Sequence, residues 1–187
     1  MLNNLQVLFD RSEQQRHSLL QQAEGLNADQ LSFQPKASEW SLMEHIHHLT
    51  LTEQELAHQA SHPKLVARLA KEQKGRVPFG VVWLILRCGI RVPVPVDSVL
   101  PLPGQSLPLL TAQWEQARSQ IKQLLEALPV AQSHQPFAIH PVCGALTPAQ
   151  ILQFTLAHGH YHLRQMQRLR HQSLRVISPH PSDLSDD

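Results

Sequence analysis

The stretch LTPAQILQFTLAHGHYHLRQMQRL, residues 146–169, decides the fold. Thr147 suits a helix N-cap and Pro148 suits the first helical position, so a helix begins here. The side chains that follow repeat every three or four residues on one face, which is the spacing of an amphipathic helix. They are Ile151, Thr155, His158, His162, Gln165, Met166 and Leu169. The pattern predicts a helix from residue 148 to about residue 171.

The three histidines of this stretch fall on two sides of the predicted helix. Each residue turns a helix by about 100°, so His158 and His162 lie roughly 40° apart and face the core. His160 points to the opposite side, toward water. The pair can bind one metal ion if a third ligand comes from a facing helix. Such pairs also occur in helices that bind no metal, so the interpretation needs a second cluster.

A second histidine cluster lies in EHIHHL, residues 44–49, on another predicted helix. His45 lies near the centre of the apolar face and His48 at its edge, whereas His47 points away. Periodicity slightly favours His45 and leaves His48 as the alternative. Three buried imidazoles without a metal would need compensating hydrogen bonds, because unpaired buried polar groups are costly. The two clusters together therefore favour a metal site.

Helical periodicity extends to four segments of the chain. Besides the helix already described, it covers residues 3–25, a segment from the N-cap Ser38 to residue 60, and residues 107–128. We expect loops at 27–35 and at PFAIHPVCGAL, residues 136–146. Four amphipathic helices with almost no strand signal predict an all-α fold, a four-helix bundle.

A long insert, residues 61–106, separates the second and third predicted helices. It contains two short helical segments, KLVARLAKEQK and FGVVWLILRCGI, and a proline-rich stretch that favours an extended path. We expect it to form a long crossover or a lid. The chain is then a single bundle domain over residues 1–172, followed by a disordered tail over 173–187.

Composition excludes several classes of protein. The net charge is +1 with 17% charged residues, and no basic face suggests nucleic acid. The most apolar stretch, residues 79–90, is interrupted by Arg87 and too short to span a membrane. The N-terminus does not resemble a signal peptide, so we expect a cytoplasmic protein. Cys88 and Cys143 lack a CxxC spacing, and reduced thiols are the simpler interpretation.

The two histidine clusters resemble the signatures of the DinB-like (YfiT-like) family. Trp40, Ser41, Glu44, His48 and Leu49 match its W-S-x-x-E-x-x-x-H-L pattern. The second stretch matches its closing H-x3-H-x2-Q pattern at His158, His162 and Gln165. The resemblance covers roughly residues 1–60 and 105–171.

This resemblance implies a bundle of up-down-down-up type and a divalent metal held by His48, His158 and His162. The family's ligand is the histidine before the leucine, so the resemblance selects His48 and makes His45 its neighbour. Gln165 would hydrogen-bond a metal-bound water or orient a ligand, and Thr52 is a further candidate beside the metal. Zinc, nickel and iron all suit imidazole ligands.

Three histidine ligands leave a coordination position open, as in catalytic sites. The resemblance implies a transferase that uses a low-molecular-weight thiol, as bacillithiol- and mycothiol-dependent relatives do, on a small-molecule substrate. Tyr161 is a weak acid/base candidate that we expect to be a packing residue.

Two alternatives remain open. A metal-dependent hydrolase would need a general base, and Glu44 faces away while Glu53 is only a possible neighbour. A non-enzymatic, metal-binding interaction module would use the apolar helix at residues 79–90 to form a homodimer. Substitution of Trp83 by glutamate would then change the oligomeric state.

Overall fold

The protein is described by a computed structural model that covers residues 1–177. It is mostly helical, which confirms the predicted all-α class. The helices are α1 (Asn3–Leu20), α2 (Ala28–Ser32), α3 (Leu42–Ala60), α4 (Pro63–Glu72), α5 (Phe79–Cys88), α6 (Leu107–Glu126) and α7 (Pro148–Ile177), with short 3-10 turns η1 (Gln21–Ala23), η2 (Asp97–Val99) and η3 (Val130–Gln132). Residues 173–177 of the predicted tail belong to α7. The remainder of that tail lies outside the described residues.

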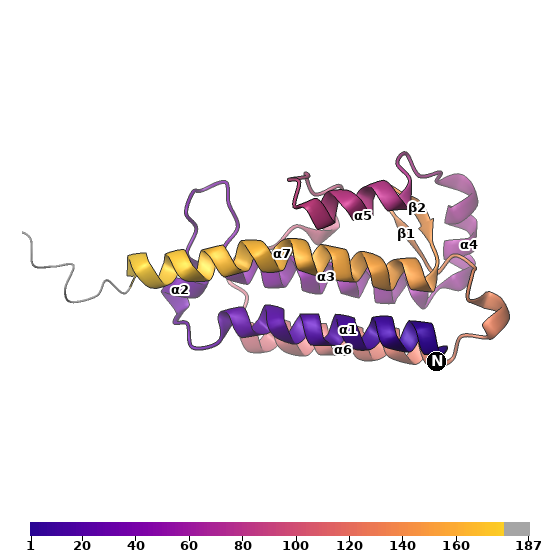
Figure 1. The fold of residues 1–187 in the computed structure, drawn as a ribbon, viewed down its shortest axis with the longest axis horizontal. Coiled ribbons are helices and arrows are strands. Elements are labelled where there is room, and N and C mark those ends of the chain that lie inside the picture. Colours follow the sequence, from indigo (N-terminus) through magenta and orange to yellow (C-terminus); the bar gives the residue numbers. More distant parts are fainter. Residues whose placement is uncertain (178–187) are drawn as a thin grey trace, which may run out of the picture.

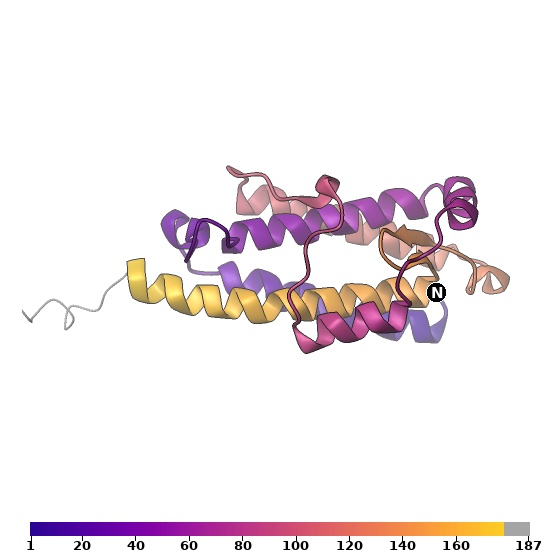
Figure 2. The same cartoon turned by 90° about the horizontal axis from the view of Figure 1, so that it is seen from above.

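The four long helices α1, α3, α6 and α7 lie side by side (Figure 1). α1 and α7 run in one direction, and α3 and α6 run in the other. The residues between α3 and α6 stay outside this group: α4 packs against a small hairpin, and α5 packs along α7. From the end of α5, the chain crosses above the group from the α7 side to the α3 side (Figure 2).

Capping residues fix where the helices begin. The Ser41 side chain accepts a hydrogen bond from the Glu44 backbone N–H, and the Glu44 carboxylate accepts one from the Ser41 N–H at 2.7 Å. This reciprocal cap starts α3 three residues after the predicted Ser38, which corrects that prediction. Thr147 caps α7 with Gln150 in the same way, as predicted. A similar cap at Asn27 starts the short α2 inside the predicted loop at 27–35.

The segment expected to be a loop at residues 136–146 contains a hairpin. Strands β1 (Ala138–His140) and β2 (Gly144–Leu146) pair antiparallel, with Ala138 opposite Leu146. Gly144 has a φ of +75°, which favours glycine, and a Cβ there would lie 2.7 Å from the Gly75 nitrogen. Strands of three residues are too short to produce a recognisable alternation, so the sequence did not reveal them.

The first and last long helices are in close contact. Gln15 Nε2 on α1 donates a hydrogen bond to the Leu156 carbonyl on α7 at 3.0 Å. A Cβ at Gly159 would meet the side-chain amide of Gln15, so a larger residue would require Gln15 to move. The glycine within HGHYH is therefore explained by helix packing.

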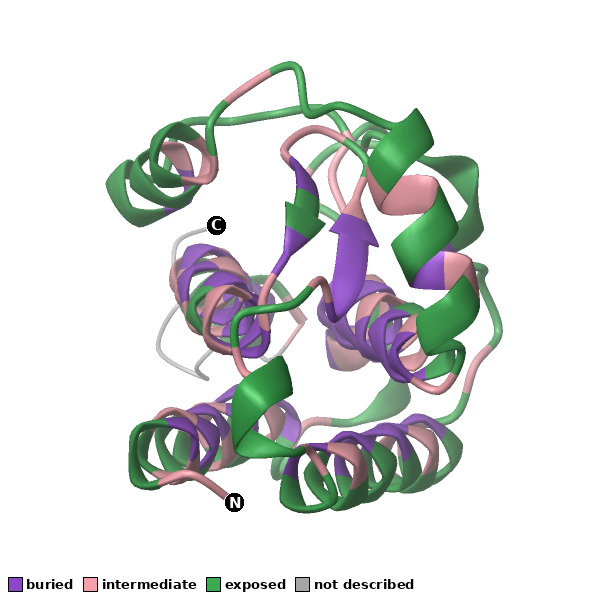
Figure 3. Ribbon diagram, turned by 90° about the vertical axis from the view of Figure 1, so that its right-hand side faces the viewer, coloured by how far each residue is buried: buried purple, intermediate pink, exposed green. Residues whose placement is uncertain are grey.

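The long helices turn their buried faces toward one another (Figure 3). The apolar core between them consists of two clusters. One contains Leu5, Phe9, Leu56, Ile121 and Ile151, among others. The other contains Leu19, Ile46, Leu49, Trp114 and Met166, among others. Ser12 and Arg16 of α1 and Glu53 of α3 are buried between the residues of these two clusters, and with the buried Arg118 of α6 they form a polar layer inside the core.

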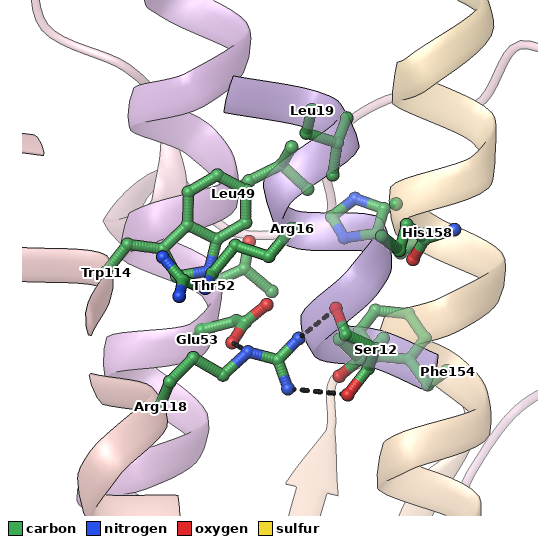
Figure 4. Close-up of a pocket in the computed structure, with 13 residues that line it drawn as sticks. Ser12, Arg16, Leu19, Leu49, Thr52, Glu53, Trp114, Arg118, Phe154 and His158 are labelled. Carbon is green, nitrogen blue, oxygen red and sulfur yellow. Dashed lines mark hydrogen bonds and ion pairs between the residues drawn. The ribbon is translucent and has the colours of Figure 1, made fainter. Parts of the chain in front are cut away.

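An ion pair forms the centre of this layer (Figure 4). Arg118 on α6 contacts the Glu53 carboxylate on α3 at 2.6 Å, and both side chains are at most 5% exposed. Arg118 also donates to the hydroxyl of Ser12 on α1 at 2.9 Å and contacts Glu13 at 3.2 Å. The layer thus joins three of the four long helices. His158 of α7 borders the same small pocket.

Loss of Arg118 should destabilise the fold strongly. Arg118→Met leaves the Glu53 carboxylate buried without its cation, so we expect the free energy of unfolding to fall by about 3–5 kcal/mol. Adding Glu53→Met should recover most of the loss, because an apolar pair replaces the unpaired charge. Urea unfolding measures both. Glu115→Ala is the control: this partner of Arg16 is 62% exposed, and its loss should cost at most about 1 kcal/mol. An Arg118→Met variant as stable as wild type would contradict the assignment.

Candidate metal centre

Three histidines from two helices meet next to the polar layer. His48 comes from α3, and His158 and His162 come from adjacent turns of α7. His48 and His162 are buried, and His158 is half-buried. Their ligand nitrogens all lie within 4.8 Å of one another. Together they could hold one metal ion.

The imidazole Nε2 atoms converge on one point. Nε2 of His158 lies 3.2 Å from Nε2 of His48 and 3.0 Å from Nε2 of His162. If all three Nε2 lone pairs are turned inward, the nitrogens repel one another at these distances. A cation between the nitrogens would remove this conflict with a small outward movement of the rings.

Hydrogen bonds at the far ring nitrogens fit this orientation. His48 Nδ1 lies 2.7 Å from the Val99 carbonyl oxygen, so it carries the proton and leaves the Nε2 lone pair free. His162 Nδ1 lies 2.9 Å from His45 Nδ1, and one of these two nitrogens must donate. If His162 is the donor, its Nε2 is also free. His45 is therefore the hydrogen-bond partner of His162 at this nitrogen.

Burial keeps these histidines neutral. It lowers the pKa of His45 to about 3. Burial first, and then the charges of neighbouring histidines, hold the pKa of His158 and of His162 well below the usual value. Burial also lowers the pKa of His48. Neutral imidazole is the form that binds metals.

Aromatic rings enclose the cluster. The Trp40 ring centroid lies 4.8 Å from that of His48 and 5.4 Å from that of His45. Phe154 stacks on His158 at 5.2 Å, one turn earlier on α7. The Tyr161 ring meets His162 edge-on at 5.0 Å, and Tyr161 is buried. Trp40 belongs to the sequence motif, but its contact with the histidines could not be read from the periodicity, because it precedes α3.

The other sequence candidates occupy different places. Thr52 borders the cavity beside the cluster, and its hydroxyl donates to the His48 carbonyl at 2.9 Å. Gln165 borders the same cavity and donates to the Tyr161 carbonyl at 3.4 Å. Glu44 caps α3, and Glu53 is held in the buried ion pair. Neither carboxylate is available as a base at the cluster.

His47 corrects one detail of the helix prediction. The sequence predicted that His47 points away from the apolar face of its helix, but the side chain is buried. The Leu102 backbone N–H donates to His47 Nδ1 at 3.0 Å. The insert therefore covers this face of α3, which periodicity alone could not indicate. His160 is half-buried on the far side of α7.

The histidine cluster opens into a cavity of about 1470 Å³. Residues of α3 and α7 line it, together with residues of α5 and of the segment that follows α5, residues 89–99. The insert thus lies over the histidine cluster. The open side of the three histidines faces this space, so a small molecule can reach it.

A family model of the DinB superfamily matches residues 11–166, which include all three histidines. The chain belongs to the DinB superfamily. The family suggested by the residue motifs is thereby confirmed. No curated protein and no solved structure matches the chain. Within residues 1–177 of this DinB-superfamily protein, no helix is both long and apolar enough to cross a membrane.

Acid should destabilise the metal-free protein. Burial lowers the pKa of His45 to about 3 and that of His140 to about 4, whereas the unfolded chain titrates near 6.5. Between these values the unfolded state binds more protons, so stability is full above pH 7 and falls as the pH drops. We expect a loss of about 2 kcal/mol per histidine between pH 7 and pH 5.

Urea unfolding in EDTA at the two pH values measures this loss. His140→Gln should reduce the loss of stability between pH 7 and pH 5 by the contribution of one histidine, about 2 kcal/mol. Stability that is constant or rises between pH 7 and pH 5 would contradict the assignment.

Proposed function

We propose that the protein binds one divalent metal ion through His48, His158 and His162. The observation that carries this proposal is the convergence of three neutral Nε2 atoms that have no other shared partner. Zinc, nickel and iron all suit this ligand set. Membership of the DinB superfamily supports the proposal. As part of it, we infer that the four long helices form an up-down-down-up bundle with residues 61–106 as its insert.

We further propose that the site serves a transferase reaction with a low-molecular-weight thiol. A bound divalent ion would lower the pKa of a coordinated thiol, so that a thiolate forms near neutral pH. The thiol sulfur then forms a bond to an electrophilic carbon of the substrate, the bond from that carbon to its leaving group breaks, and the thiol proton passes to solvent. The chain's part is to hold the reactants together and to limit the access of water.

The surrounding residues support this division of roles. Trp40 and Phe154 present apolar ring surfaces beside the histidines, and these restrict water. Two carboxylates border the cavity within residues 1–177: Glu39 is ion-paired with Lys36, and Glu55 accepts a hydrogen bond from Gln59. A thiolate needs no carboxylate to activate it, whereas a hydrolase would need a general base here. The arrangement therefore favours thiol transfer over hydrolysis.

Metal content tests the ligand set. Protein purified without a histidine tag should contain near one equivalent of a divalent metal, measured by mass spectrometry. His48→Ala and His162→Ala should each lose most of it, because two imidazoles bind a metal far more weakly than three. His160→Ala is the matched control, since it removes a histidine from the same helix without touching the cluster. Equal metal in all four proteins would refute the assignment.

Cobalt substitution tests the thiol. Cobalt(II)-loaded wild type titrated with cysteine should develop a sulfur-to-cobalt charge-transfer absorption, because the open position admits a thiolate. Cysteine should then react with 1-chloro-2,4-dinitrobenzene faster in the presence of the zinc-loaded wild type than in the presence of His162→Ala. Metal binding without a spectral change would rule out the thiol and favour the interaction module, for which the exposed Val81, Trp83 and Leu84 of α5 would supply the contact.

A further inference from the structure

The cavity above the histidines is larger than one thiol requires. Its volume is about 1470 Å³, whereas sites for a single small molecule usually measure about 300–1000 Å³. Phe154 and Gln172 of α7 both border it, and the helical rise between them is about 27 Å. The cavity is therefore elongated along α7, with the histidine cluster between its two ends.

One end of the cavity is apolar. Val82, Ile85 and Leu86 of α5 face it from above, and Ile139 and Val142 of the hairpin close it. Burying such surface against an apolar group is favourable at roughly 25 cal/mol per Å². This end therefore suits a hydrocarbon or aromatic body.

The other end carries positive charge. Arg91, Arg164 and Arg168 border it. Arg164 is engaged, because it donates to the Leu86 and Arg87 carbonyls at the end of α5. Within residues 1–177, Arg91 and Arg168 have no ion-pair or hydrogen-bond partner. Glu39 also borders this end, but its carboxylate is paired with Lys36.

Arg168 borders the same cavity as His45 and His162. A free guanidinium pairs well with a carboxylate or a phosphate.

We propose that the substrate is an apolar organic anion that lies along this cavity. Its negative group pairs with Arg91 and Arg168, and its apolar body lies beneath α5. The electrophilic carbon then falls between these ends, beside the histidine cluster. The position of the electrophilic carbon in this assignment rests on the proposed thiol transfer. The binding contacts do not, because Arg91, Arg168 and α5 form them.

Calorimetric titration with decanoate and with decanol tests the assignment, because the two probes share a chain and differ in charge. Decanoate should bind the zinc-loaded protein at least about tenfold more tightly than decanol does. The double variant Arg91→Gln, Arg168→Gln should lose about tenfold for decanoate and nothing for decanol. Arg175→Gln, on the same helix but outside the cavity, should change neither. Equal binding of the two probes, or equal effects of the two sets of arginine substitutions, would overturn the anionic end.

The apolar end has its own matched pair on α5. Val82→Asp faces the cavity and should weaken both probes, whereas Val81→Asp, on the exposed side, should weaken neither. Circular dichroism checks that both variants fold, and Val82→Ser replaces Val82→Asp if the latter does not. Equal effects at positions 81 and 82 would overturn the placement beneath α5.

A titration of metal-free protein separates this inference from the proposed function. Decanoate should bind without zinc nearly as well as with it, since its carboxylate pairs with arginines. Binding that requires zinc would mean that the carboxylate contacts the metal, and it would overturn the arginine assignment. Retained decanoate binding in a protein that shows no thiol chemistry would overturn the transferase proposal alone.

Discussion

The ion pair between Arg118 and Glu53 fixes the position of α3 relative to α6 along their axes. A charge buried this deeply must find its partner, so α3 and α6 can dock only where these two side chains coincide. Ser12 adds α1 to the same level. His48 precedes Glu53 on α3 by little more than one turn, and it lies opposite His158 of α7. The position of His48 relative to α1 and α6 thus depends on a contact that His48 does not make.

The insert takes part in the centre as well as covering it. The Val99 carbonyl fixes the tautomer of His48, and the backbone of Leu102 holds the adjacent His47. Two neighbouring histidines of α3, His47 and His48, therefore hold residues 99–102 of the insert. A change in the path of residues 89–102 would alter the orientation of a candidate metal ligand as well as access to the cavity. The insert, which a simple four-helix bundle lacks, is thus hydrogen-bonded to His48, one of the three candidate metal ligands.

The sequence predicted the helices and the inward pair His158 and His162, because both follow from a period of 3.6 residues. It could not choose between His45 and His48, since both side chains face α7. The difference lies in which ring nitrogen each presents, which periodicity does not encode. Contacts between distant segments were also out of reach: the Arg118–Glu53 pair, the Trp40 ring over the histidines and the insert over His47 all join residues that no local pattern links.

The contact between α1 and α7 has a consequence for how the chain folds. Gln15 and Leu156 are separated by 141 positions, yet they touch. During synthesis the face of α1 that packs on α7 must remain uncovered until α7 has left the ribosome. Closing so long a loop is entropically costly and slows folding. Early folding must therefore rest on nearer pairs such as α3 with α6, and the first helix of the sequence is among the last to find its place.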